Sequence, residues 1–171
     1  MKIPLILNGE DVELEANPCD SLLKILRRQK LYSVKCGCEK GQCGNCLVLL
    51  DDRPVPSCLI KLGFARGKDI KTLEYFSSAK KTDVDEDILI YKDIISAFST
   101  SGIHMCGYCN AGKIFTAYEI LKVFKRPSAE QVFTAIKGLD TCCTDSMTLA
   151  AGILLAASLK AEREGIYANV K

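Results

Sequence analysis

Cysteine dominates the chemistry that this sequence could perform, with ten cysteines among 171 residues. Three of them keep a C-x4-C-x2-C spacing and one more follows further along the chain: Cys38, Cys43, Cys46 and Cys58. This pattern is typical of a plant-type [2Fe–2S] site, in which four thiolates converge on one small cage. Gly41 and Gly44 lie inside the same loop, and glycine admits left-handed backbone and lets the chain pass close to inorganic sulfur. The pattern therefore predicts an iron–sulfur cluster held by this loop.

A tetrahedral zinc centre is the alternative for this loop. Zinc knuckles usually pair two C-x2-C units, whereas only Cys43 and Cys46 form such a unit here, so the spacing favours iron and sulfide. Cys36 does not keep the gap to Cys43 that Cys38 keeps. We therefore predict that Cys36 is a packed or merely adjacent thiol and not a ligand.

A second group of cysteines follows in the other half of the chain: Cys106, Cys109, Cys142 and Cys143. Each pair precedes a predicted helix, with a helical hairpin between the pairs. Two converging helix N-termini would direct backbone N–H groups and positive dipole ends toward anionic thiolates. These thiolates could hold a second [2Fe–2S] cluster. Zinc and a disulfide are the alternatives, and a disulfide is the least favoured of the three in a reducing compartment.

Two further residues with reactive side chains are predicted to be structural. Cys19 precedes a helix cap and has no other cysteine near it in sequence. His104 is the only histidine, so it has no histidine to pair with as a ligand, and a surface or packed position is favoured. The alternative for His104, two residues from Cys106, is to tune a cluster or to touch a partner.

The elements that must position the first cysteine loop form a small sheet with one helix. In order, the pattern predicts strands at 3–7 and 10–15 around Asn8-Gly9, a helix from Asp20 or Ser21 to near Lys30, a strand at 47–50, a turn at Asp51-Asp52, an edge strand at 53–56, and runs at 59–64 and 70–73 that complete the sheet. Asn-Gly between apolar runs is the strongest short hairpin signal, and proline confines a strand to an edge. A hairpin, a helix across it and a cysteine loop indicate a β-grasp arrangement.

The second half of the chain changes to helical spacing. The polar interval 77–87 is predicted to be a linker. Four helices are predicted after it, at 88–98, at 114–124, from Ser128 to Gly138 and at 146–162. Ser101-Gly102 ends the first, Pro127 ends the second, and a Ser128–Gln131 capping box begins the third, which Gly138 ends. The last helix is rich in alanine and leucine, which indicates burial in a bundle. The predicted fold class is thus α+β, with a ferredoxin-like domain at 1–76, the linker, and a four-helix bundle domain at 88–171.

Composition excludes several classes of function. The net charge is +2, and neither a basic run nor an interleaved aromatic platform predicts nucleic-acid binding. No apolar run reaches membrane-spanning length, and the N-terminus shows no signal-peptide pattern. We therefore expect a cytoplasmic protein, where clustered cysteines serve as metal ligands more often than as disulfides.

The order of these motifs resembles one known family. A plant-type cysteine loop, Asp-Asp-Arg-Pro-Val-Pro-Ser-Cys over 51–58, a linker, Cys-Gly-Tyr-Cys over 106–109, a helical hairpin and a cysteine pair are similar to the small iron–sulfur subunit of the molybdenum hydroxylases. That family includes xanthine dehydrogenase, aldehyde oxidase and carbon monoxide dehydrogenase. The resemblance covers nearly the whole chain.

The resemblance implies a [2Fe–2S] cluster in each of two domains. In the family, the C-terminal cluster lies close to molybdopterin in a large subunit, where substrate is hydroxylated with oxygen from water. The N-terminal cluster passes electrons toward FAD, usually in another subunit. No phosphate-binding glycine motif occurs in this chain, and we predict no catalytic residue on it. It would be an electron conduit whose activity exists only in the complex with the molybdopterin-binding and FAD-binding subunits.

The sequence departs from the family pattern near the second cysteine group. Met105 stands where the family has a glutamine, and Asn110-Ala111-Gly112 replaces Thr-Pro-Gly. The family's Cys-Arg-Cys aligns with Thr141-Cys142-Cys143. Adjacent Cα atoms lie about 3.8 Å apart, so distance does not exclude two neighbouring ligands. Either the turn shifts so that Cys142 can serve as a ligand, or this cluster is altered or absent.

The leading hypothesis is an electron-transfer subunit of a molybdopterin-dependent hydroxylase or dehydrogenase acting on a purine, another N-heterocycle or an aldehyde. One alternative is a free-standing ferredoxin-like carrier. The other is an assembly subunit whose second cluster is altered or lost. A large apolar surface on both domains would favour the subunit, and an acidic ring around an exposed cluster would favour the carrier.

Overall fold

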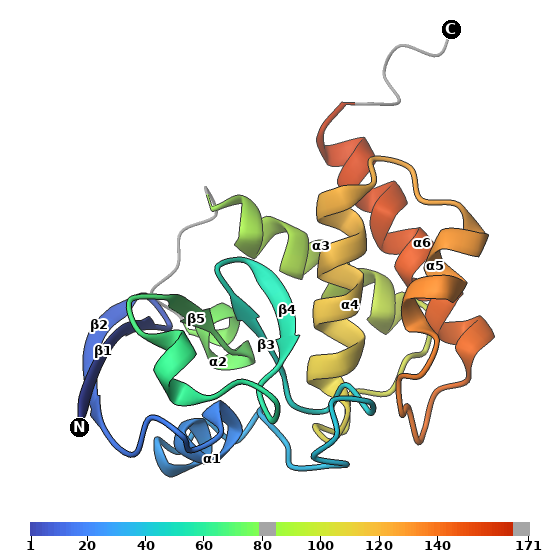
Figure 1. The fold of residues 1–171 in the computed structure, drawn as a ribbon. Coiled ribbons are helices and arrows are strands. Elements are labelled where there is room, and N and C mark those ends of the chain that lie inside the picture. Colours follow the sequence, from blue (N-terminus) through green and yellow to red (C-terminus); the bar gives the residue numbers. More distant parts are fainter. Residues whose placement is uncertain (79–84, 166–171) are drawn as a thin grey trace, which may run out of the picture.

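The computed structural model describes residues 1–78 and 85–165, and its N-terminal part is built on one mixed sheet (Figure 1). The strands are β1 (Lys2–Leu7), β2 (Glu10–Glu15), β3 (Leu47–Leu50), β4 (Arg53–Pro56) and β5 (Asp69–Lys71). Their spatial order is β2-β1-β5-β3-β4, with β1 parallel to β5 and the other neighbours antiparallel. The proline-bearing strand β4 lies at an edge, as the sequence predicts.

The predicted hairpin and helix are both confirmed. Asn8 and Gly9 have φ values of 54° and 83°, the left-handed pair that a tight hairpin turn requires. Helix α1 (Leu22–Arg28) is capped by the Ser21 side chain, which accepts a hydrogen bond from the Lys24 backbone. The apolar face of α1 packs into the sheet core with residues of β1, β2, β3 and β5.

The predicted run at 59–64 is not a strand. Leu62–Ala65 form a short 3₁₀ helix, η1, in which Leu62 and Ala65 are buried and Phe64 between them is exposed. Burial at a spacing of three residues matches one 3₁₀ turn and does not match a strand. The backbone N–H groups of Leu62 and Gly63 bond to the segment before α1, so this stretch packs there and does not extend the sheet. Strand β5 also ends at Lys71, and α2 (Leu73–Ser77) follows it.

The C-terminal part is helical and contains α3 (Glu86–Thr100), α4 (Asn110–Val123), α5 (Ala129–Ile136) and α6 (Ser146–Arg163). All four predicted helices are present, and both hydrogen bonds of the Ser128–Gln131 capping box form. Helix α3 begins inside the predicted linker, and residues 79–84 of that linker lie outside the described residues. No helix in the described ranges is long and apolar enough to cross a membrane.

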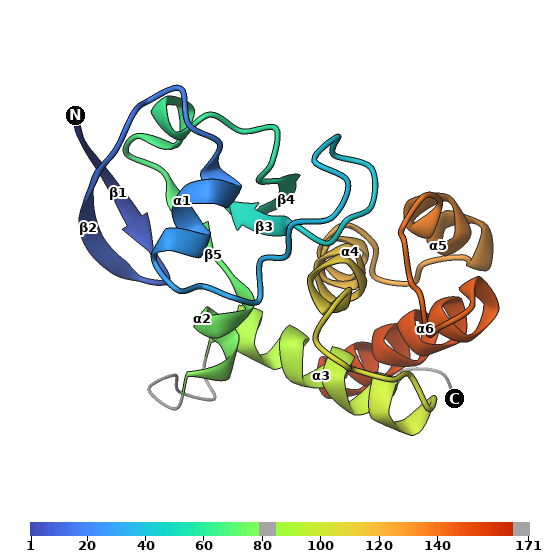
Figure 2. The ribbon, with the colours of Figure 1, turned by 90° about the horizontal axis from the view of Figure 1, so that it is seen from below.

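Helix α4 joins the two parts of the molecule. It contacts β3 and β4 on one side and α3, α5 and α6 on the others, and Figure 2 shows it between the sheet and the pair α5–α6. Residues from Ala111 to Tyr118 are therefore all buried. A helix surrounded in this way needs no polar face, which explains why its sequence is apolar nearly all round.

A buried ionic network fixes the sheet to the helices. The carboxylate of Asp87 on α3 accepts hydrogen bonds from Lys71 of β5 (3.0 Å), from Tyr118 (2.6 Å) and from Lys122 of α4 (2.7 Å). Burial opposes ionisation, but these donors outweigh it and lower the pKa of the Asp87 carboxyl to about 2. The network thus ties three elements together with one charged acceptor.

Candidate metal centres

The first cysteine loop presents backbone donors to one thiol. The N–H groups of Lys40, Gln42 and Cys43 lie 3.3, 3.3 and 3.4 Å from Cys38 Sγ. These hydrogen bonds, with Lys40 the strongest, lower the pKa of Cys38 to about 6. The loop therefore favours a thiolate at Cys38, and a thiolate is the form that binds metal.

The thiols of this group interact as two pairs, Cys38 with Cys43 and Cys46 with Cys58, and among the described residues no three of them converge within 4.8 Å. Cys38 donates its backbone N–H to Cys43 Sγ at 3.5 Å. Buried Ser57 donates from its N–H and its hydroxyl to the Cys46 carbonyl, at 3.1 and 2.7 Å, and this places Cys58 beside Cys46. Burial and hydrogen bonding with Cys58 shift the pKa of Cys46, with burial the largest effect, and the result is a rise to about 11.

The glycines and an asparagine leave room and donors for a further group. Gly41 and Gly44 have φ values of 71° and 78°, which confirms the left-handed backbone predicted for them. A Cβ on Gly37 would lie 2.8 Å from Cys43 Sγ and 3.2 Å from Asn45 Nδ2. Asn45 is 1% exposed, and neither polar atom of its side-chain amide has a hydrogen-bond partner among the described residues. An unpaired buried amide beside thiols fits an anionic cluster that accepts hydrogen bonds.

The sequence pattern did not identify Gly37 and Asn45 as residues of this site. Cys36, Cys19 and His104 are not among the paired thiols. The thiol of Cys36 is 3.1 Å from Glu39 Oε1, and that contact raises the pKa of Cys36. Cys19 is exposed at the surface, and so is His104 in the helical part.

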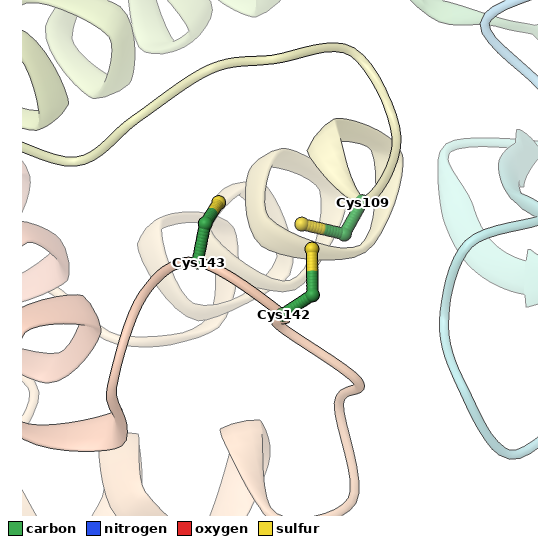
Figure 3. Close-up of side chains that lie close together, drawn as sticks. All are labelled: Cys109, Cys142 and Cys143. Carbon is green, nitrogen blue, oxygen red and sulfur yellow. The ribbon is translucent and has the colours of Figure 1, made fainter.

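The second group converges from two loops. Sulfur atoms of Cys109, Cys142 and Cys143 all lie within 4.8 Å of one another (Figure 3). Cys109 caps helix α4, and the cysteine pair lies in the loop before α6. Cys106 lies outside this group of three, but it is close enough to Cys143 to contribute to the lowered pKa of that thiol. The adjacent cysteines therefore both reach the site, although the family spacing would separate them by one residue.

These thiols differ in their tendency to ionise. Desolvation and the neighbouring Cys143 raise the pKa of Cys142. Desolvation also acts on Cys143, but a hydrogen bond with Thr144 and the charge of Lys113 outweigh it, so the pKa of Cys143 is lowered. Cys143 is therefore the thiol of the adjacent pair that ionises first.

The two cysteine groups touch each other through backbone. The N–H of Asp140, two residues before Cys142, donates to the Cys43 carbonyl at 3.1 Å. A Cβ on Gly44 would lie 2.5 Å from Leu139 Cδ2 and 3.4 Å from the Cα of Gly112 on α4. The loop of the first group thus packs directly on both segments that carry the second group.

Comparison with known proteins identifies the chain. The 2Fe-2S iron-sulfur cluster binding domain matches residues 5–71, and the [2Fe-2S] binding domain matches residues 72–158. The nicotine 6-hydroxylase small subunit of Paenarthrobacter nicotinovorans is 31% identical over 155 residues, which are 90% of this chain and 88% of that protein. The xanthine dehydrogenase iron-sulfur-binding subunit of Escherichia coli O157:H7 is 36% identical over 119 residues, which are 70% of this chain and 69% of that protein.

The chain belongs to the small [2Fe–2S] subunits of the molybdenum hydroxylase family. Two solved structures of this family agree. Quinoline 2-oxidoreductase from Pseudomonas putida 86 gives a TM-score of 0.81 at 31% identity, over 96% of this chain and 97% of that chain. The aldehyde oxidoreductase of Desulfovibrio desulfuricans ATCC 27774 gives 0.79 at 32%, over 94% of this chain but only 17% of that much longer one.

Membership in this family confirms the central predictions from the sequence. The chain carries two [2Fe–2S] clusters, one in each matched domain, and it is an electron-transferring subunit of an oxidoreductase. Its relatives are small subunits of larger enzymes, so larger partner subunits are implied.

Proposed function

We propose that the first cluster is held by Cys38, Cys43, Cys46 and Cys58, and the second by Cys106, Cys109, Cys142 and Cys143. The thiol pairing and the unpaired Asn45 amide support the first set. The convergence of three sulfurs within 4.8 Å supports the second, with Cys142 in place of the family's first cysteine. When bound, a [2Fe–2S] cluster accepts and releases one electron.

We also propose the finer division of the fold. Residues 1–76 form a β-grasp domain, 77–87 a linker and 88–171 a four-helix bundle domain. The parallel pairing of β1 with β5 and the packing of α1 on the sheet support the first, and the mutual packing of α3, α4, α5 and α6 supports the last.

The path between the clusters carries the functional proposal. Electrons from molybdenum in a large molybdopterin-binding subunit enter the second cluster, cross to the first and leave toward FAD on another subunit. The single observation that carries a direct path between the clusters is the hydrogen bond from Asp140 to Cys43, because it connects a proposed ligand of one cluster to the loop of the other. The direction along this path is taken from the family resemblance. Relatives named for nicotine, xanthine and quinoline favour an N-heterocyclic substrate, with an aldehyde as the alternative.

The same proposal gives the partners and the cellular compartment of the protein. Its partners are the two cofactor-bearing subunits, and no role with nucleic acid is assigned. We place it in the cytoplasm, because clustered cysteines in a reducing compartment serve as metal ligands more often than as disulfides.

Purification of the native complex through a tag on this chain tests the assignment. Molybdenum, FAD and two larger subunits should co-elute in fixed proportion. Rapid mixing with the substrate, followed by freezing, should show both EPR signals of the reduced clusters. A chain that elutes alone at its own 18.8 kDa and exchanges electrons only with unrelated proteins would instead be a free-standing carrier.

A further inference from the structure

A fully buried lysine lies beside the second cysteine group. Lys113, on the first turn of α4, has an exposed fraction of 0%. Its Nζ donates to the backbone carbonyl of His104 at 2.5 Å, and the same carbonyl oxygen lies 3.8 Å from Cys143 Sγ. The ammonium group and this thiol therefore share one acceptor atom.

The position of this lysine is unfavourable in the bare polypeptide. A buried ammonium group needs a counter-charge, and no carboxylate within the described ranges forms an ion pair with Lys113. It also lies at the helix N-terminus, where the helix dipole disfavours a cation. The other well-buried lysine, Lys71, has carboxylate partners in Asp52 and Asp87. Lys113 lacks such a partner, so its counter-charge must come from something else in the site.

The thiols of the second group supply negative charge at this place. Lys113 acts electrostatically on Cys143, which stands within reach of Cys106, Cys109 and Cys142. Two ferric ions, two sulfides and four thiolates together carry a net charge of about −2, and reduction by one electron makes it about −3. A fixed cation stabilises the reduced form more than the oxidised form.

We propose that Lys113 is the built-in counter-charge of the second cluster and raises its reduction potential. The inference rests on the ligands assigned above under the proposed function. The step is a one-electron reduction: one ferric ion becomes ferrous, no bond to the chain forms or breaks, and no proton is needed. The electron comes from the partner's molybdenum centre in turnover, or from dithionite in the test.

An EPR-monitored redox titration of the intact complex tests the role of Lys113. In the K113M variant, the reduced-to-oxidised ratio of the second cluster at a fixed potential should fall at least tenfold, which is about 59 mV for one electron. The signal of the first cluster should keep its midpoint. K113R keeps the positive charge, so the midpoint potential of its second cluster should stay near that of the wild type. K125M removes an exposed lysine beyond the opposite end of α4 and should change neither midpoint.

Each other outcome is decisive as well. An unchanged midpoint in K113M overturns the proposal, and so does an equal shift in K113M and K113R, since packing would then be the cause. Loss of the second cluster in K113M with retention in K113R supports a need for the cation, whereas loss in both overturns it. A wild-type complex with a single signal would contradict the proposed function itself, and this control is measured first.

Discussion

The two cysteine groups use the same ligand chemistry in different electrostatic surroundings. Around the first group, the donors are neutral: backbone N–H groups aimed at Cys38 and the unpaired amide of Asn45. Beside the second group lies a whole positive charge, Lys113, together with the N-terminus of α4. Dipoles and net charge act differently on an anionic cluster, so the chain sets two different environments for two chemically equal groups.

The groups also differ in their contact with solvent. Cys43 and Cys46 are buried in the first group, whereas Cys106, Cys142 and Cys143 are exposed in the second. The second site is therefore only partly enclosed by this chain. This difference agrees with the proposal that electrons enter at the second cluster, where a larger subunit would cover it.

Serine in place of one ligand of each group should give the largest effect and separate the two sites. C43S should abolish the EPR signal of the first cluster and stop electron transfer to flavin while the second signal persists. C109S should abolish the EPR signal of the second cluster while the first signal persists, because each cluster depends on its own four thiolates. C36S is the matched control, since Cys36 contacts Glu39, and should keep both. An unchanged spectrum in C43S would refute the ligand assignment.

Loss of the Asp87 charge should weaken the connection between the sheet and the helices. In D87N, Lys71 and Lys122 lose their shared carboxylate, and breaking a buried ionic contact of this kind costs about 3 kcal/mol. Urea unfolding of the cluster-loaded chain measures this free energy. Exposed D11N serves as the control. A loss below about 0.5 kcal/mol would mean that the Asp87 network does not stabilise the contact between the sheet and the helices.

Alanine at Gly44 should disturb the contact between the two sites. Its φ of 78° disfavours a side chain, and the new Cβ would meet Leu139, so we expect a loss of about 2 kcal/mol in unfolding free energy. G67A is a close match, because Gly67 has a φ of 70° but no atom within 4 Å of the added Cβ. It should cost only about 1 kcal/mol. Equal losses in G44A and G67A would show that the Gly44–Leu139 packing has no energetic role.

Acid should remove the Asp87 contribution in a defined range. The folded pKa of about 2 lies below the ordinary value of 3.8, so the contribution is complete above about pH 4 and is lost as the pH falls through about 2. After allowance for solvent, it amounts to about 1 to 2 kcal/mol. The difference in unfolding free energy between wild type and D87N should therefore narrow by about 1 to 2 kcal/mol between pH 5 and pH 2. A constant difference over this range would contradict the lowered pKa.

The sequence predicted those elements that short-range rules define. Asn8-Gly9 admits few conformations other than a hairpin turn, and Ser128 with Gln131 satisfies a helix start by itself. Such features depend on neighbours close in the chain, so tertiary packing does not override them.

Features that depend on contacts between distant parts of the chain were either not predicted or predicted wrongly. The run at 59–64 has strand-like composition, but its packing before α1 makes it a 3₁₀ turn. Lys113 looked like an ordinary helix residue, although it shares a helical face with Ala117 and Ile120, both buried. A lysine on an apolar face was the available signal. The contact of Gly44 with Leu139 had no signal in the sequence, because it joins two segments that are far apart along the chain.

Iron and acid-labile sulfide per chain, measured with EPR of the dithionite-reduced protein, test the central claim most directly. Two unlike surroundings for two clusters predict about four irons and four sulfides per chain and two distinct EPR signals with separate midpoints. About two irons with a single signal, or zinc bound by the second group, would contradict this account.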